Sequence, residues 1–269
     1  MLSVKDFNGE DKQVKYIDIN ADIAQSFGVY KNDLEFDLLP YCSSVNVSCG
    51  LHSGDPTTIN NVLKILSTKN EIAIGAHVGY PDIQGFGYRE MNMTEDEIEA
   101  LILYQIGAIQ AMANNHNLRI CHVRPHGALY KKAMEDFNTM LALAKAVKKA
   151  GDWLILLCGA CENLKKASEI AEINYAGEVF LDKKYDINGL PLFNSGDVVD
   201  TEYSKKMLET LLEKNAVINE EGGISEVDFH SVHLSIKNSC SIEIAEMVKN
   251  RAEGILPLSA AIIKDKSWI

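Results

Sequence analysis

Short apolar runs typical of strands alternate with amphipathic patterns typical of helices along most of this 269-residue chain. The strand-like runs cover residues 16–22, 44–48, 71–77, 119–123, 153–157, 175–179 and 227–234. Helical spacing of apolar residues fills most intervals, at residues 57–69, 94–115, 137–150, 162–172, 201–214 and 239–251. This alternation predicts parallel strands joined by crossover helices.

The alternation predicts one α/β domain over residues 1–269, with seven strands closed, or nearly closed, into a TIM-like barrel. An open doubly wound sheet is the alternative, but the sequence has neither a G-x-G-x-x-G turn nor a G-x-x-x-x-G-K-[ST] phosphate loop. Residues 1–14 are expected to form a loose extension or an edge element laid over the barrel. In a parallel barrel, functional residues lie in the loops that follow the strands.

The overall charge argues against broad classes of partner. A net charge of −12 and a pI of about 5.1 disfavour nucleic acid and anionic membrane. No apolar run approaches the roughly 20 residues that span a bilayer, and the N-terminus is charged and polar rather than a secretory leader. The six cysteines, including the pair Cys158 and Cys161, are interpreted as reduced and mostly buried thiols, and the expected location is the cytoplasm.

Three histidines each lie beside a glycine where a strand-like run ends: His52, His77 and His126. The carboxyl ends of parallel strands meet at one edge of a sheet, so at least two of these histidines are expected to share one site. His122 and His126 are four residues apart across Pro125, which is not the helical spacing of a zinc protease motif. The fold, rather than one helix, would have to bring such a site together.

Asp22 ends the first strand-like run, and Asp18 and Asn20 alternate with it on one strand face. Asp22 is interpreted as a general base or a metal ligand, although Asp18 and Asn20 also suit the capping of neighbouring loops. A divalent metal bound by Asp22, His52 and His126 is chemically reasonable, because imidazole and carboxylate suit zinc and similar ions. Acid–base catalysis without a metal fits the same residues, so both interpretations stay open.

Two arginines are candidates for binding a carboxylate group of a substrate. Arg89 ends a Gly-rich loop, and Arg124 precedes Pro125. Guanidinium matches the geometry of a carboxylate, whereas a surface ion pair is the alternative role.

The helix predicted at residues 94–115 begins with a capping box formed by Thr94 and Glu97. Its core face is predicted from helical spacing to consist of Leu101, Tyr104, Ala108 and Ala111. This is the longest helical pattern of the chain.

Several motifs occur in a distinctive order before residue 131. They are Asn20-Ala-Asp22, Cys49-Gly-x-His52-x-Gly-Asp55-Pro56, Gly75-Ala-His77-x-Gly-Tyr-Pro-Asp82, Gly85-Phe-Gly-x-Arg89 and Pro125-His126-Gly-Ala-Leu-Tyr130. Together they resemble the LamB/YcsF family, which includes the A subunit of the bacterial ATP-dependent 5-oxoprolinase. The resemblance extends over about residues 16–252 and implies a distorted (β/α) barrel similar to the glycoside hydrolase/deacetylase barrels.

The resemblance also implies an activity, the ATP-coupled opening of the lactam of 5-oxo-L-proline to L-glutamate. In the family, the A subunit works with 5-oxoprolinase subunits B and C, so ATP would be a cofactor used through partner chains, in keeping with the missing phosphate loop. The expected catalytic residues are Asp22, His52, Asp55, His77 and His126, and the expected substrate-binding residues are Asn20, Asn46, Arg89 and Arg124.

The chain departs from the family pattern at positions where charge matters. Gln25 stands where the family has Glu, Ser235 where it has Asp, and Lys183 where it has Arg. A further family arginine corresponds to Phe193 or Asn194. Two alternatives remain. Asn20-Ala-Asp22 and the paired histidines would also suit a stand-alone metal-dependent deacetylase-like hydrolase. Because an amide or hydroxyl cannot replace a carboxylate base, Gln25 and Ser235 favour a catalytically silent paralogue that binds a small ligand. Formation of a homo-oligomer is compatible with each.

Overall fold

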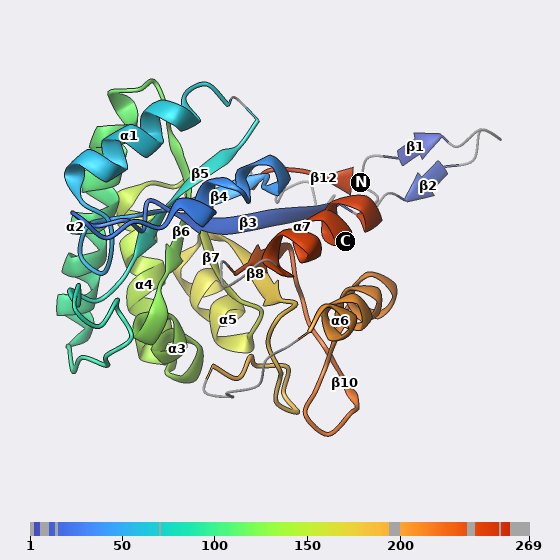
Figure 1. Ribbon diagram of the computed structural model, residues 1–269. Helices are drawn as coiled ribbons and strands as arrows, with labels where there is room; N and C mark the ends of the chain where they lie inside the picture. The colour runs from blue at the N-terminus through green and yellow to red at the C-terminus, as the bar shows by residue number, and fades with distance from the viewer. Residues whose placement is uncertain are drawn as a thin grey trace.

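The computed structural model describes residues 3–5, 11–13, 16–69, 71–193, 200–235, 240–252 and 254–258. A ring of seven parallel strands forms its centre (Figure 1). The ring runs in order through β3 (Tyr16–Ile23), β4 (Ser44–Ser48), β5 (Ala73–Val78), β6 (Ile120–Pro125), β7 (Ile155–Gly159), β8 (Asn174–Phe180) and β11 (Ser231–Leu234). Strand β11 pairs with β3 and closes the ring, so the predicted seven-stranded barrel is confirmed.

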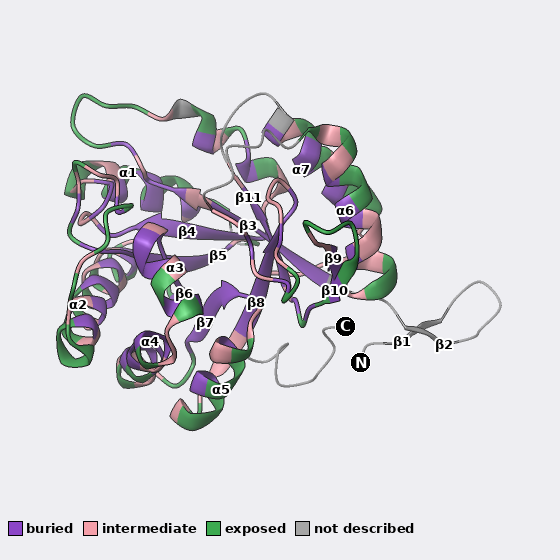
Figure 2. Ribbon diagram, turned by 90° about the horizontal axis from the view of Figure 1, so that it is seen from below, coloured by how far each residue is buried: buried purple, intermediate pink, exposed green. Residues whose placement is uncertain are grey.

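Helices cover the outside of the ring, and the strands that form the ring are buried over most of their length (Figure 2). The helices are α1 (Pro56–Leu66), α2 (Glu95–Asn114), α3 (Gly127–Glu135), α4 (Phe137–Ala150), α5 (Glu162–Ala171), α6 (Thr201–Lys214) and α7 (Cys240–Arg251). Two short 3-10 helices, η1 (Asp33–Phe36) and η2 (Leu39–Tyr41), follow β3. None of the helices within the described ranges combines the length and apolar character needed to cross a bilayer.

Helix α2 begins as predicted but buries a different face. The capping box is present, because the Thr94 hydroxyl accepts a hydrogen bond from Glu97 N and the Glu97 carboxylate accepts one from Thr94 N. The predicted core face was wrong: Tyr104 is 65% exposed. The buried side chains are instead those of Ile98, Ile102, Gln105, Ile106, Ile109 and Ala113. Apolar residues lie all around this helix, so their spacing alone does not identify the inner face.

Several short elements are additional to the predicted set. Helix α3 follows β6 directly, and a hairpin of β9 (Ala216–Ile218) and β10 (Ile224–Glu226) precedes β11. Strand β12 (Gly254–Ile255) pairs with the beginning of β3. Near the N-terminus, β1 (Ser3–Lys5) and β2 (Asp11–Gln13) pair only with each other and project away from the barrel (Figure 1).

The interior of the barrel is mostly polar, whereas the layer between strands and helices is apolar. Successive strand residues point to opposite faces, and most of the apolar ones pack outward against the helices. A small separate apolar cluster consists of Ala73, Ile155, Leu157, Ala176 and Leu258. The buried polar residues of the strands are Asp18, Asn20, Ser44, Asn46, Ser48, His77, His122, Arg124, Glu178, Ser231 and His233. Buried polar groups must find partners among themselves, so the fold concentrates hydrogen-bonding and charged groups inside the ring.

Candidate functional site

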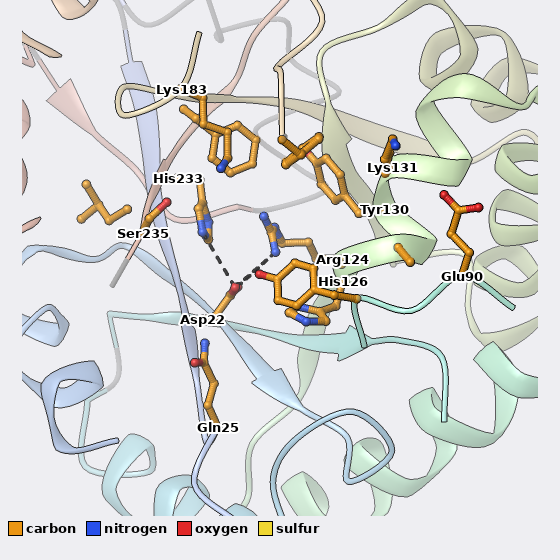
Figure 3. Close-up of a pocket in the computed structure, with 16 residues that line it drawn as sticks. Asp22, Gln25, Glu90, Arg124, His126, Tyr130, Lys131, Lys183, His233 and Ser235 are labelled. Carbon is orange, nitrogen blue, oxygen red and sulfur yellow. Dashed lines mark hydrogen bonds and ion pairs between the residues drawn. The ribbon is translucent and has the colours of Figure 1, made fainter. Parts of the chain in front are cut away.

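A pocket of about 580 Å³ opens at the carboxyl ends of β3, β6, β8 and β11. Its lining is shown in Figure 3 and consists of Asp22, Gln25, Tyr88, Glu90, Arg124, His126, Gly127, Ala128, Tyr130, Lys131, Phe180, Lys183, Phe193, His233, Leu234 and Ser235. A cavity of this size and mixed lining suits a small organic ligand. The pocket therefore lies at the edge of the sheet where function was predicted.

Asp22 is the anionic centre of the pocket, with Arg124 and His233 directed at its carboxylate (Figure 3). Arg124 Nη1 lies 3.2 Å from Oδ1, and His77 Nε2 lies 3.2 Å from Oδ2. Asn46 Nδ2 donates to Oδ1 at 2.9 Å. Burial by itself raises the pKa of Asp22, but Arg124, His77 and His233 outweigh it and lower this pKa well below its usual value. Asp22 is therefore a carboxylate at neutral pH.

Glu178 lies outside the predicted set, yet it is part of the same charged network. It is buried on β8, and Arg124 Nε donates to its two carboxylate oxygens at 2.8 and 3.1 Å. Arg124 thus bridges Glu178 and Asp22, and burial, which lowers the pKa of the guanidinium, is overcome by the two carboxylates. The signal in the sequence is a single charged residue in an otherwise uncharged buried strand.

His233 is the second functional candidate outside the predicted set. On β11, its Nδ1 lies 2.8 Å from Asn20 Oδ1, and its Nε2 lies 3.8 Å from Asp22 Oδ2. Burial, together with the positive charge of Arg124, lowers the pKa of His233 to about 4, so the ring is neutral at neutral pH. The signal in the sequence is a histidine near the end of another strand-like run.

His52, His77 and His126 form a histidine cluster beside the pocket, and one nitrogen from each lies within 4.8 Å of the others. His77 Nε2 and His126 Nδ1 are 2.9 Å apart, and His126 Nε2 lies 2.7 Å from the carbonyl oxygen of Phe86. The rings of His52 and His126 stack at 4.1 Å with an angle of 10°. The structure thus brings together all three histidines that the strand ends predicted.

The histidine cluster has the composition of a metal site but not a converging geometry. Metal-binding lone pairs lie in the plane of an imidazole, so two stacked parallel rings direct theirs side by side rather than at one point. His77 and His126 already share a hydrogen bond, and Asp22 contacts the cluster through His77. Binding of a metal by Asp22, His52 and His126 would therefore require at least one ring to turn.

Asp55 and Arg89 are not among the residues that line the pocket. Asp55 caps α1, accepting hydrogen bonds from the backbone of Thr57 and Thr58, and it also accepts one from Gly28 N. The bonds from Thr58 and Gly28 lower the pKa of Asp55 to about 2. Arg89 forms an ion pair with Asp82, and its side chain is 62% exposed. The hydrogen bonds and the ion pair of Asp55 and Arg89 therefore stabilise the loops that contain these residues.

Asn20 and Asn46 lie beneath the pocket rather than in its lining. Asn46 Nδ2 donates to Asn20 Oδ1 at 2.8 Å, and Asn46 Oδ1 lies 2.8 Å from His122 Nε2. Asn20 Nδ2 donates to Glu178 Oε2 at 3.1 Å. The two amides therefore connect the charged groups of the pocket floor.

Aromatic rings and a lysine form the wall opposite Asp22. The rings of Tyr130, Phe180 and Phe193 meet edge to face, with centroids 5.6–6.0 Å apart. Lys183 Nζ lies 5.3 Å from the ring centre of Phe180 and 5.0 Å from that of Phe193. Gln25 and Ser235, two positions that depart from the family pattern, line the pocket as well. Asn194, the other residue aligned with a family arginine, lies outside the described residues.

Comparison with known proteins identifies relatives along almost the whole chain. Residues 17–256 match the model of the LamB/YcsF family. The 5-oxoprolinase A subunit of Staphylococcus carnosus is 33% identical over 244 residues, which are 89% of this chain and 96% of that protein. The 5-oxoprolinase A subunit of Bacillus subtilis is 36% identical over 232 residues, covering 83% of this chain and 85% of the relative.

Solved structures share the same architecture. A lactam utilization protein from Thermus thermophilus superposes with a TM-score of 0.81 at 30% identity, covering 90% of this chain and 99% of that one. A putative cellobiose-phosphate cleavage protein from Enterococcus faecalis superposes with a TM-score of 0.55 at 13% identity, covering 92% and 98% of the two chains. The second likeness concerns the fold alone.

Proposed function

The chain belongs to the LamB/YcsF family, and from this premise we propose that it is the A subunit of an ATP-dependent 5-oxoprolinase. The reaction is the opening of the lactam of 5-oxo-L-proline to L-glutamate. The observation that carries the proposal is the pocket itself, in which an ionised Asp22 and a neutral imidazole face one small cavity. Water attack on an amide carbonyl needs groups of this kind, an imidazole to accept a proton and a carboxylate to stabilise the imidazolium that forms.

The substrate would lie with its carboxylate toward Lys183. Arg124 lines the pocket, but its guanidinium is already shared by Asp22 and Glu178. Lys183 is a cation of the opposite wall, and its ammonium group lies over Phe180 and Phe193. These rings offer apolar surface to the methylene groups of the lactam ring. This binding mode would direct the lactam carbonyl toward Asp22.

The coupling to ATP would depend on partner subunits. An unstrained five-membered lactam is a stable amide, and the sequence has no phosphate loop of the G-x-x-x-x-G-K-[ST] type. The relatives carry the name of one subunit of a 5-oxoprolinase, and the B and C subunits would bind ATP and complete the reaction. Such an enzyme would act in the cytoplasm, where ATP is supplied.

Acid–base catalysis by the protein's own side chains is favoured over a metal-dependent reaction. The stacked rings of His52 and His126 do not converge on one point, whereas Asp22 already has cationic and hydrogen-bonding partners. The metal content of the purified chain tests this choice, and well under one ion per chain is expected. A stoichiometric ion lost on substitution of His52 would instead favour the deacetylase-like alternative.

The test of the proposed function is 5-oxoproline-dependent ATP hydrolysis and glutamate release, measured with and without the B and C subunits. Turnover is expected only in the complete mixture, which would also show that Gln25 and Ser235 are compatible with activity. An assembled complex that releases no glutamate would contradict the proposal and favour a ligand-binding paralogue. Glutamate release by the chain alone would remove the role of partners.

A further inference from the structure

Two histidines line the pocket, His126 and His233, and their hydrogen bonds differ. Both ring nitrogens of His126 have partners, since Nδ1 contacts His77 and Nε2 contacts the Phe86 carbonyl, which can only accept. His233 has a hydrogen-bond partner at Nδ1, whereas among the described residues its Nε2 has only the longer contact of 3.8 Å with Asp22. His233 Nε2 is therefore the imidazole nitrogen best placed to react with a ligand.

The orientation of the Asn20 amide follows from its neighbours. Glu178 is paired with Arg124 through both carboxylate oxygens, so it can only accept hydrogen bonds. The atom of Asn20 that faces Glu178 Oε2 at 3.1 Å must therefore be the amide nitrogen. The same nitrogen lies 2.8 Å from the Ser231 hydroxyl. Turning the amide round would place its carbonyl oxygen against the carboxylate.

The orientation of Asn20 in turn fixes the proton on His233. Asn20 Oδ1 accepts a hydrogen bond from Asn46 Nδ2 and lies 2.8 Å from His233 Nδ1. A carbonyl oxygen has no proton to give, so the proton of this bond must be on Nδ1 of His233. Asn46 cannot turn round either, because its amide nitrogen also faces the carboxylate of Asp22. In the neutral ring, the lone pair is consequently on Nε2.

From this geometry we infer that His233 is the general base and acid of lactam opening, with Nε2 as the reacting atom and Asn20 as its positioning residue. The inference rests on the proposed function, and it assigns to a residue beyond the predicted set the proton transfer that the reaction needs. A protonated Nε2 would lie 3.8 Å from Asp22 Oδ2, and Nδ1 lies 3.7 Å from Glu178 Oε2, so two carboxylates stabilise the imidazolium.

The proposed step needs only His233, one water molecule and the lactam, and its atoms and electrons balance. Nε2 takes one proton from a water molecule as the water oxygen bonds to the lactam carbonyl carbon, and the π pair moves to the carbonyl oxygen. When that pair returns, the ring C–N bond breaks and its electrons go to nitrogen, which takes the proton back from Nε2. One water is added and His233 is regenerated.

The variant His233→Asn tests the role of Nε2 separately from that of Nδ1. The Asn amide can still donate to Asn20 Oδ1 as Nδ1 does, but it has no base in place of Nε2. With the assembled complex, kcat is expected to fall about 10²–10⁴-fold, the usual contribution of general acid–base catalysis, while KM for 5-oxoproline stays unchanged. The matched control is His116→Asn, because His116 follows α2 and contacts Asn60 outside the pocket. Wild-type kcat in His233→Asn would overturn the inference.

A second measurement, made on the isolated chain, determines directly which ring nitrogen of His233 carries the proton. The ¹⁵N spectrum of the His233 ring is expected to show a protonated Nδ1 and an unprotonated Nε2 at neutral pH. A proton on Nε2 instead would overturn the inference. The outcomes also separate the two proposals: no turnover by a wild-type complex removes the proposed function together with this role, whereas wild-type turnover with an unimpaired His233→Asn removes only the role of His233.

Discussion

The histidine cluster and the charged region formed by Asp22, Arg124, Glu178 and His233 lie side by side at the mouth of the barrel but differ in construction. In the cluster, rings contact rings, and buried His52 has no hydrogen bond to either ring nitrogen from the part of the chain that the structure describes. In the charged region, every ionised side chain has a partner of opposite charge. His77 joins the two, since it contacts both His126 and Asp22.

The difference shows that a histidine at a strand end is not by itself a catalytic group. Two glycines, Gly79 and Gly87, lie close against the histidine cluster and leave no room for a side chain. A Cβ on Gly79 would lie 2.6 Å from His52 Nδ1, and one on Gly87 would lie 2.7 Å from His126 Cδ2. His126 and His233 both line the pocket, but both ring nitrogens of His126 have close partners, whereas His233 Nε2 lies 3.8 Å from Asp22. We therefore interpret the cluster as the packed support of the pocket and the charged region as its reactive part.

The largest effect on stability is expected from Arg124→Met. This change leaves Asp22 and Glu178 buried without their shared cation, and breaking a buried ion pair from one side costs about 3–5 kcal/mol. Urea unfolding of the variant and of the wild type measures the difference. Loss of less than about 1 kcal/mol, the value of an exposed ion pair, would show that the charged region is not a coupled network.

Stability is expected to fall as the pH falls below about 6.5, the ordinary pKa of histidine in an unfolded chain. Burial lowers the pKa of His122 and His126 to about 3 and that of His233 to about 4, and it lowers the pKa of His52 well below its usual value. At a pH between the lowered pKa values of the folded chain and the ordinary pKa of the unfolded chain, the unfolded chain binds protons that the folded chain does not. Acid therefore favours unfolding.

Each of these histidines contributes a slope of up to roughly 1.4 kcal/mol per pH unit. Urea unfolding between about pH 7 and pH 5 measures the net slope, in which Asp18, whose pKa burial raises to about 6, opposes the histidines. His233→Asn is expected to reduce the slope by the share of one histidine. Equal stability across this range would contradict the neutral, buried state of these four histidines.

A smaller loss is expected from Gly87→Ala, at a cost of about 1–3 kcal/mol. Gly87 has φ of +75°, and an added Cβ would meet His126 and His52. The matched control is Gly107→Ala in α2, where nothing lies within 4 Å of the new Cβ and a gain of about 0.5–1 kcal/mol is expected. Thermal unfolding measures the change in stability of each variant. Equal shifts of the unfolding midpoint in Gly87→Ala and Gly107→Ala would show that the cluster is loosely packed.

The barrel could be predicted from the sequence because each of its strands is a short apolar run between turn residues or helical patterns. The histidine cluster was predicted for a related reason, since strand ends of a parallel sheet meet at one edge. Helix α3 was not predicted, because its nine residues begin at a glycine and include two exposed or half-buried lysines, Lys131 and Lys132.

The roles within the site could be predicted only in part. Asp22 lies near the end of one buried strand and Asp55 follows another, and nothing in the sequence distinguishes a pocket carboxylate from a helix cap. Glu178 and His233 were not predicted, because their importance comes from partners more than 50 residues away in the chain, Arg124 and Asn20. Contacts of that kind depend on strand register, which the sequence alone does not define.

If the charged region performs the reaction, the carboxylate of Asp22 is required for turnover, and the variant Asp22→Asn removes it. The amide keeps the size of the carboxylate but removes the charge beside Arg124 and His233. Glutamate release by the assembled complex is the measurement, with Asp152→Asn, an exposed residue paired with Lys148, as the control. A fall in kcat of about 10²–10⁴-fold is expected for Asp22→Asn alone. Wild-type turnover in a folded Asp22→Asn complex would contradict it.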